Sequence, residues 1–226
     1  MTLQNKKKVL FFLPGGVGGA ERMSLTIGSM LPQDEYEVKF VVVGRKTDVF
    51  KILSKGYNVI HLNIRNKYCA PITRMMAIIM REKPQFTFSS VMYLNIRVLI
   101  ASKLMGVKCI VRNDNYLNMV SKRTRWELKH VYPFAYHIIA QQEEMAENLV
   151  QGLNLPPQKV VVRHNPLNTE NIDKLSQEPS PYPQDDSINY LWVGNFLQTK
   201  GHDILAKAFK LVHETNPKTH LYFIDD

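Results

Sequence analysis

The sequence predicts a doubly wound parallel α/β fold, and three observations lead to that prediction. Short runs such as residues 9–13 and 40–43 are continuously apolar, as are strands that are covered on both faces. Segments with apolar residues at three- and four-residue spacing alternate with these runs. The first run ends at Pro14 and continues through four glycines into such a segment. Strands and helices that alternate in this way favour a parallel sheet.

The glycine turn at residues 15–19 is the first candidate site. Glycines let a backbone approach an anion closely, and the first N–H groups of a helix have no partner within the helix. The candidate phosphate-binding residues are Gly15, Gly16, Val17, Gly18 and Gly19. Glycine also serves close packing in such turns, so both interpretations stay open. The letters fit neither the dinucleotide fingerprint, because Glu21 replaces its third glycine, nor the P-loop, which would need lysine after its last glycine.

The alternation of strands and helices continues along the chain. Strands are expected at 37–44, 58–62, 85–91, 108–111, 136–140 and 160–162, and helices at 20–31, 48–54, 73–81, 94–105, 121–131 and 143–153. Pro84 and Gly106 supply stop signals for two of these helices.

A change of composition predicts two domains. Residues 167–187 are polar and contain three prolines, as linkers do. Beyond them a strand at 190–193, a helix at 202–214 and a strand at 220–224 begin a new unit. A single β-α-β unit cannot bury both faces of its strands. The predicted organisation is therefore an N-terminal domain at 1–166, a linker at 167–187 and an incomplete second domain at 188–226.

Composition bounds the class of protein. The chain has 226 residues, 45% of them hydrophobic, so it is globular, and its net charge of +9 indicates either an anionic partner or solubility alone. Cys69 and Cys109 lie forty residues apart without a metal-ligand pattern, which favours reduced thiols in the cytoplasm. The apolar run after Lys8 is too short for a signal peptide, and no run reaches the roughly 18 apolar residues of a membrane span.

Polar residues follow two predicted strands at the edge where open parallel sheets bind ligands. Tyr93 and Asn95 follow the strand at 85–91, and both are acceptor-side candidates, although a helix cap is the favoured role for Asn95. Arg112, Asn113 and Asp114 follow the strand at 108–111 and are the candidate catalytic residues. Turn chemistry would explain asparagine and aspartate there as well.

The helix expected at 121–131 carries four basic residues around Trp126. Such a helix can contact an anionic membrane surface, while a solvated face with one anchoring residue is the plainer interpretation.

Three segments together resemble the group 1 (family 4) retaining glycosyltransferases of the GT-B fold. They are Gly-Gly-x-Gly-Gly-Ala-Glu-Arg at 15–22, His-Asn-Pro-Leu-Asn at 164–168, and Val-Gly-Asn-Phe at 193–196 followed by Lys-Gly-His-Asp at 200–203. Their order and separations match that family over essentially the whole chain. The resemblance implies two Rossmann-like domains that face each other, with a nucleotide-sugar donor held mainly by the second and the acceptor by the first.

The resemblance also implies roles for individual residues. The glycine loop would lie over the donor diphosphate, and Lys200 would neutralise that leaving group. Asn195 stands where an arginine partner of this lysine is often found. Arg112, Asn113 and Asp114 replace a histidine that often lies near the reacting sugar. The donor is a nucleotide-diphosphate sugar used as substrate, and no cofactor and no metal are expected.

The sequence departs from the family pattern at its end. The paired-glutamate motif that binds the donor sugar is absent, and Asp225 stands where glycine is usual. We therefore expect a truncated transferase that turns over its donor poorly without a further domain or a partner subunit. The alternative is a non-catalytic acceptor-binding half of a split transferase. A nucleic-acid-binding protein ranks last, because only the charge supports it. The expected acceptor is a glycan or a lipid-linked glycan of surface polysaccharide biosynthesis, reached from the cytoplasmic face of the membrane.

Overall fold

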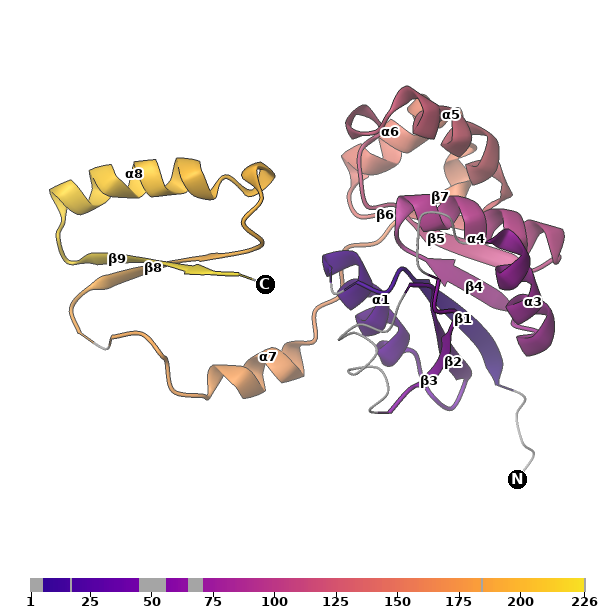
Figure 1. Cartoon of the computed structure of the whole chain (residues 1–226), viewed down its shortest axis with the longest axis horizontal. Helices are drawn as coiled ribbons and strands as arrows, with labels where there is room; N and C mark the ends of the chain where they lie inside the picture. The colour runs from indigo at the N-terminus through magenta and orange to yellow at the C-terminus, as the bar shows by residue number, and fades with distance from the viewer. Residues whose placement is uncertain (1–5, 17, 45–55, 65–70, 184, 226) are drawn as a thin grey trace. The chain divides into compact units, whose positions relative to one another are not determined.

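The computed structural model of the chain describes residues 6–16, 18–44, 56–64, 71–183 and 185–225. The chain divides into two compact units, Met1–Leu167 and Asn168–Asp226, and each is described by itself (Figure 1). This division lies next to the predicted start of the linker.

The described strands of unit 1 form one parallel sheet of seven strands, as the sequence predicts. They are β1 Lys7–Leu13, β2 Tyr36–Val42, β3 Asn58–His61, β4 Phe86–Ser89, β5 Lys108–Arg112, β6 His137–Ala140 and β7 Val160–Val162. The helices are α1 Gly19–Met30, α3 Ile72–Glu82, α4 Met92–Leu104, α5 Lys122–Val131 and α6 Glu143–Leu153, with short 3₁₀ turns at Leu117–Met119, Tyr132–Phe134 and Pro157–Lys159. The doubly wound α/β prediction is confirmed.

The helices end where the stop signals predict. Lys83, directly before Pro84, takes a left-handed φ of 48° and closes α3, and Gly106 has a φ of 68° after α4. The helix α4 begins at Met92, two residues before its predicted start, so that Tyr93 and Asn95 belong to its first turn. The helix expected at 48–54 lies outside the described residues.

The core has two layers because the strands are covered on both faces. Leu10 and Phe12 point into a cluster with residues of α3, α4, α5 and α6, while Val9, Phe11 and Leu13 pack against the opposite cluster with residues of α1. Figure 1 shows α1 on one face of the sheet and α3 and α4 on the other. Because every pair of neighbouring strands is parallel, the carboxyl ends of all seven strands lie at one edge of the sheet.

The strand order β3-β2-β1-β4-β5-β6-β7 reverses its direction between β1 and β4. The connections from these two neighbouring strands leave in opposite directions, which opens a crevice beyond their carboxyl ends. The segments that follow β1 and β4 are the glycine turn and Ser90-Val91. The carboxyl edge of the sheet is therefore where this fold would bind a ligand.

Unit 2 contains the helix α7 Thr169–Ser176, the parallel strands β8 Ile188–Val193 and β9 Thr219–Ile224, and the helix α8 His202–Thr215. The helix α7 lies within the segment that is predicted to be a linker, so part of that segment is helical. Several apolar side chains of the unit are exposed, among them Leu191 by 51% and Val193 by 59%. The described residues of unit 2 therefore leave part of its sheet uncovered.

Candidate functional site

Packing explains the first glycine of the loop after β1. Gly15 has a φ of 103°, and a Cβ atom there would lie 3.2 Å from the Cα atom of Gly44. The amide of Gly44 donates to the carbonyl of Pro14 over 2.9 Å, so the two segments run against each other. Glycine is required at both positions for this close approach. Val17 lies outside the described residues.

The carboxylate of Glu21 lies against the next two glycines of the loop that the structure describes. A Cβ atom on Gly16 would lie 3.0 Å from one oxygen of Glu21, and a Cβ atom on Gly18 would lie 2.9 Å from the other. Glu21 is in the first turn of α1 and is only 7% exposed. The described glycines of the loop therefore lie against a carboxylate in the first turn of the following helix. The positive end of the helix dipole stabilises a negative charge at this position. A Cβ atom on Gly19, in contrast, would meet nothing within 4 Å.

Hydroxyl groups hold the start of α1 against the end of β4. The hydroxyls of Ser24 and Ser90 form a hydrogen bond with each other over 2.5 Å. The carbonyl of Ala20 lies 3.0 Å from the hydroxyl of Ser24 and 3.1 Å from that of Ser90, and it accepts from the hydroxyl that does not donate to the other serine. Both serines are buried. The first turn of α1 is therefore fixed directly beside the point where the sheet reverses direction.

The side chain of Asn113 is part of the interior. Asn113 is fully buried, its Nδ2 donates to the carbonyl of Asn115 over 2.5 Å, and its Oδ1 accepts from the hydroxyl of Tyr132 over 2.9 Å. Its carbonyl accepts from Gln141 over 3.2 Å. Every polar group of the side chain is occupied by the protein, so a supporting role fits this position better than the predicted catalytic one.

Arg112 is the last residue of β5 and is 4% exposed. Its guanidinium donates to Oδ1 of Asn165 over 2.6 Å. Burial lowers the pKa of Arg112, and the nearby charge of Asp114 acts in the opposite direction. The guanidinium is thus a buried cation beside a carboxylate at the carboxyl edge of the sheet.

Asp114 has one carboxylate oxygen that is bonded and one that is not. The carboxylate accepts hydrogen bonds from its own backbone N–H, from the side chain of Asn115 and from the backbone N–H of Met92 at the start of α4. Its Oδ1 atom is buried and has no hydrogen-bond partner among the described residues. Burial raises the pKa of Asp114 above its ordinary value of 3.8. A buried acceptor without a partner normally receives a water or a ligand group.

The carboxyl ends of β6 and β7 join the same network. Asn165 donates to Oε1 of Gln141 over 3.2 Å, and a ring nitrogen of His164 lies 2.9 Å from the carbonyl of Gln141. The His-Asn-Pro segment is thereby held against Arg112. Gln141 is not among the predicted site residues, although its place directly after a predicted strand was a usable signal. Tyr132 is not among them either, and the sequence holds no signal for it.

The two acceptor-side candidates differ in burial. Asn95 is fully buried, and its Nδ2 donates to the carbonyl of Arg112 over 3.0 Å and to the hydroxyl of Tyr132 over 3.3 Å. The helix is capped at Val91 without a side-chain bond, so the expected capping role of Asn95 is wrong. Its burial leaves it no surface for an acceptor. Tyr93 is half-buried in the same turn.

In unit 2, both predicted donor residues are exposed. Asn195 follows Gly194 after β8, and Lys200 ends the 3₁₀ turn Gln198–Lys200, directly before α8. The indole of Trp192 donates to the carbonyl of Lys200 over 3.3 Å, which fixes the turn. A lysine ammonium and the positive end of a helix therefore lie together at the carboxyl end of β8.

Among the described residues, no group of three or more histidines, cysteines or acidic residues could hold a metal ion. No helix in the described part of the chain is long and apolar enough to cross a membrane.

A parallel sheet with a switch point, a glycine loop and polar strand ends defines a Rossmann-like α/β protein with a ligand-binding edge. Residues 17–171 match the model of Glycosyltransferase Family 4. The chain belongs to that family. No curated protein matches the sequence significantly.

Solved structures share the fold. A glycosyltransferase from Rickettsia africae ESF-5 matches with a TM-score of 0.67 and 14% identity over 98% of this chain and 69% of the other. Anabaena Alr3699/HepE in complex with UDP matches with a TM-score of 0.66 and 14% identity, over 96% of this chain and 69% of the other. A putative UDP-N-acetylglucosamine 2-epimerase from Listeria monocytogenes matches with a TM-score of 0.63 and 15% identity, over 96% of this chain and 62% of the other. The chain thus spans about two thirds of the length of these proteins.

The raised pKa of Asp114 predicts a pH-dependent effect on stability. Above pH 3.8 the unfolded chain loses this proton while the fold still favours the protonated form, so the wild type loses stability as pH rises through the higher folded pKa. Asp114→Asn, which mimics the protonated acid, should gain unfolding free energy relative to the wild type over that range. Chemical denaturation at a series of pH values measures this, with Asp34→Asn in an exposed turn as the control. A difference independent of pH would contradict it.

Proposed function

We propose that this chain forms the acceptor side, the diphosphate loop and the start of the donor-binding unit of a retaining glycosyltransferase. It would transfer a hexosyl group from a nucleotide-diphosphate sugar to a glycan or lipid-linked acceptor of surface polysaccharide biosynthesis, in the cytoplasm. The family match over residues 17–171 carries the class of reaction. The named complex of the Anabaena protein with UDP supports a uridine nucleotide as the first donor to test.

The leaving group determines what the donor side must supply. When the bond between the anomeric carbon and the diphosphate breaks, negative charge develops on the diphosphate oxygens, and cations or N–H groups at that point lower the barrier. On the donor side, we assign the ammonium of Lys200 in unit 2 to this charge.

Asp114 is the residue we assign to the acceptor. The acceptor hydroxyl forms the new bond to the anomeric carbon and must lose its proton. A carboxylate with a raised pKa and a free oxygen suits a group that accepts a hydrogen bond from that hydroxyl. Arg112 is a positioning residue in this proposal, since its guanidinium is held by Asn165 and balances the charge of Asp114.

The alternative proposal is an acceptor-binding half of a split transferase. It would use the same strand-end cluster of unit 1 but would take its nucleotide site from a partner subunit. The two proposals differ in nucleotide affinity. If UDP does not protect the isolated chain from thermal unfolding while a second subunit restores transfer, the split transferase is correct.

Lys200→Met tests the donor assignment. Removing one charge-assisted hydrogen bond to the diphosphate should weaken UDP binding by about tenfold, as measured by titration calorimetry. Lys207→Met, which removes an exposed lysine of α8, should bind UDP like the wild type. Equal affinities for all three proteins would refute a role for Lys200.

Asp114→Asn tests the acceptor assignment. Replacing the carboxylate should lower the release of UDP from UDP-glucose in the presence of acceptor by about 10²-fold, the usual loss for a proton-accepting group, while UDP affinity stays unchanged. Asp34→Asn serves as the control. An Asp114→Asn enzyme with undiminished transfer would exclude the proposed role.

We also propose that α5 touches an anionic membrane surface. Trp126 is 63% exposed, and Met119, shortly before the helix, is 73% exposed. The basic side chains beside them are Lys122, Arg123, Arg125 and Lys129, all exposed. Arg123 pairs with Glu127 over 3.1 Å, which lowers the net charge available for lipid headgroups.

Trp126→Ala should weaken binding to phosphatidylglycerol vesicles by about tenfold at low salt, because a large apolar side chain no longer inserts into the interface. Co-sedimentation at low and high salt measures the effect, with Leu211→Ala in α8 as the control for an exposed apolar side chain. Absence of vesicle binding by the wild type at low salt would end this proposal.

A further inference from the structure

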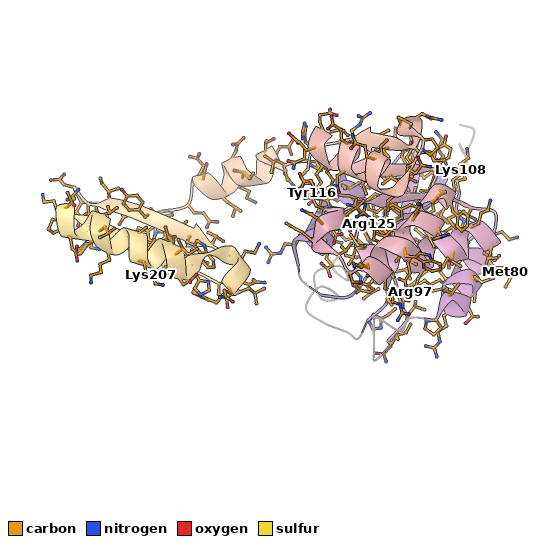
Figure 2. The ribbon with its side chains drawn as sticks, turned by 90° about the horizontal axis from the view of Figure 1, so that it is seen from above. Met80, Arg97, Lys108, Tyr116, Arg125 and Lys207 are labelled. Atoms are coloured by element: carbon orange, nitrogen blue, oxygen red, sulfur yellow. The ribbon has the colours of Figure 1, made fainter. Side chains whose placement is uncertain are left out.

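A hollow lies at the amino-terminal end of the strands, away from the edge described above. Its volume is about 490 Å³. The lining comes from the α4–β5 turn, the segment before β6 and the residue before β7, and consists of Lys103, Gly106, Val107, Lys108, Phe134, Ala135, Tyr136 and Lys159. Lys108 begins β5, whereas Tyr116 follows the carboxyl end of that strand, and Figure 2 shows these two residues toward opposite sides of unit 1. The hollow is therefore separate from the proposed transfer site.

Three lysines border this hollow, and no described lining residue is acidic. None of the three forms a salt bridge with another described residue. Lys103 lies in the last turn of α4, where a cation offsets the helix dipole, so that position alone has an ordinary structural explanation. The dipole of α4 does not explain Lys108 or Lys159. Cations gathered at one place without a counter-charge repel each other and attract an anion.

Contacts with the protein hold the ammonium groups in place. The Nζ atom of Lys159 donates to the carbonyls of Pro133 and Ala135 over 2.5 and 2.9 Å. Because an ammonium has three hydrogens, one remains for a ligand. The Nζ atom of Lys108 lies 4.6 Å from the ring centroid of Tyr136, and that of Lys103 lies 5.7 Å from the ring centroid of Phe134.

The aromatic rings beside the lysines suit a ligand that has an apolar part as well as an anionic group. Phe134 is 45% exposed and Tyr136 is 43% exposed, so each ring offers an apolar surface beside the cations. The volume exceeds that of a single phosphate ion. We propose that this hollow binds a phosphate or diphosphate group that is attached to a larger, partly apolar molecule. Phosphate suits the arrangement because its oxygens accept bonds from several ammonium groups at once.

The phosphate could be carried by a soluble molecule or by a lipid headgroup, and two probes separate these sources. Inorganic pyrophosphate is titrated into the isotope-labelled full chain, and the amide signals of Gly106 and Tyr136 report the hollow by NMR. Signals of Gly18 and Gly19 report the proposed donor loop in the same spectra, so failure at one site is distinguishable from failure at the other. Vesicles of phosphatidylglycerol, compared with phosphatidylcholine, test the lipid source.

The double variant Lys103→Met/Lys108→Met removes two charges from exposed positions and leaves the two hydrogen bonds of Lys159 to backbone carbonyls unchanged. It should weaken the pyrophosphate or vesicle binding seen at Gly106 and Tyr136 by at least about tenfold. Lys207→Met in unit 2 should behave like the wild type. If neither probe shifts the signals of Gly106 and Tyr136, or if the double variant binds as tightly as the wild type, the hollow is not a phosphate site.

Discussion

The reversal of strand order between β1 and β4 is the constraint on which the functional edge depends. Connections that leave these strands in opposite directions cannot cover the space beyond them, so the chain must stabilise an open edge. It does so with the paired hydroxyls of Ser24 and Ser90, which join the first turn of α1 to the end of β4. The first turn of α1, which follows the glycine loop, is consequently held beside the end of β4.

A buried polar network supports the other half of that edge. Asn95 donates to Tyr132, Tyr132 donates to Asn113, and Arg112 extends the network to Asn165. The Oδ1 atom of Asn95 is buried and has no hydrogen-bond partner among the described residues, so the bonding of this network is incomplete. A buried acceptor without a partner costs free energy and calls for a water or a ligand group. The Oδ1 atom of Asp114, at the same edge of the sheet, is in the same position.

The sequence predicts the strands well because a strand covered on both faces is continuously apolar, as in β1, and because Pro84 and Gly106 end their helices visibly. It predicts the edge at which polar residues gather, since parallel strands end together. It does not tell which of those residues are buried. Asn95 donates a hydrogen bond to Tyr132, which is 37 residues away in the sequence. The residue type does not show whether an asparagine that follows a strand is buried or exposed to solvent. The place of Glu21 within the glycine loop depends on the path of the backbone, which spacing cannot supply.

The uneven burial of the two units has a consequence for how the chain loses its structure. Unit 1 has apolar clusters on both faces of its sheet, whereas unit 2 leaves side chains such as Leu191 and Val193 in contact with water. Regions with few buried apolar contacts open at a lower free energy than a closed core. Unit 2 would therefore exchange its amide hydrogens first and come apart while unit 1 remains folded, so a single melting temperature would not describe this chain.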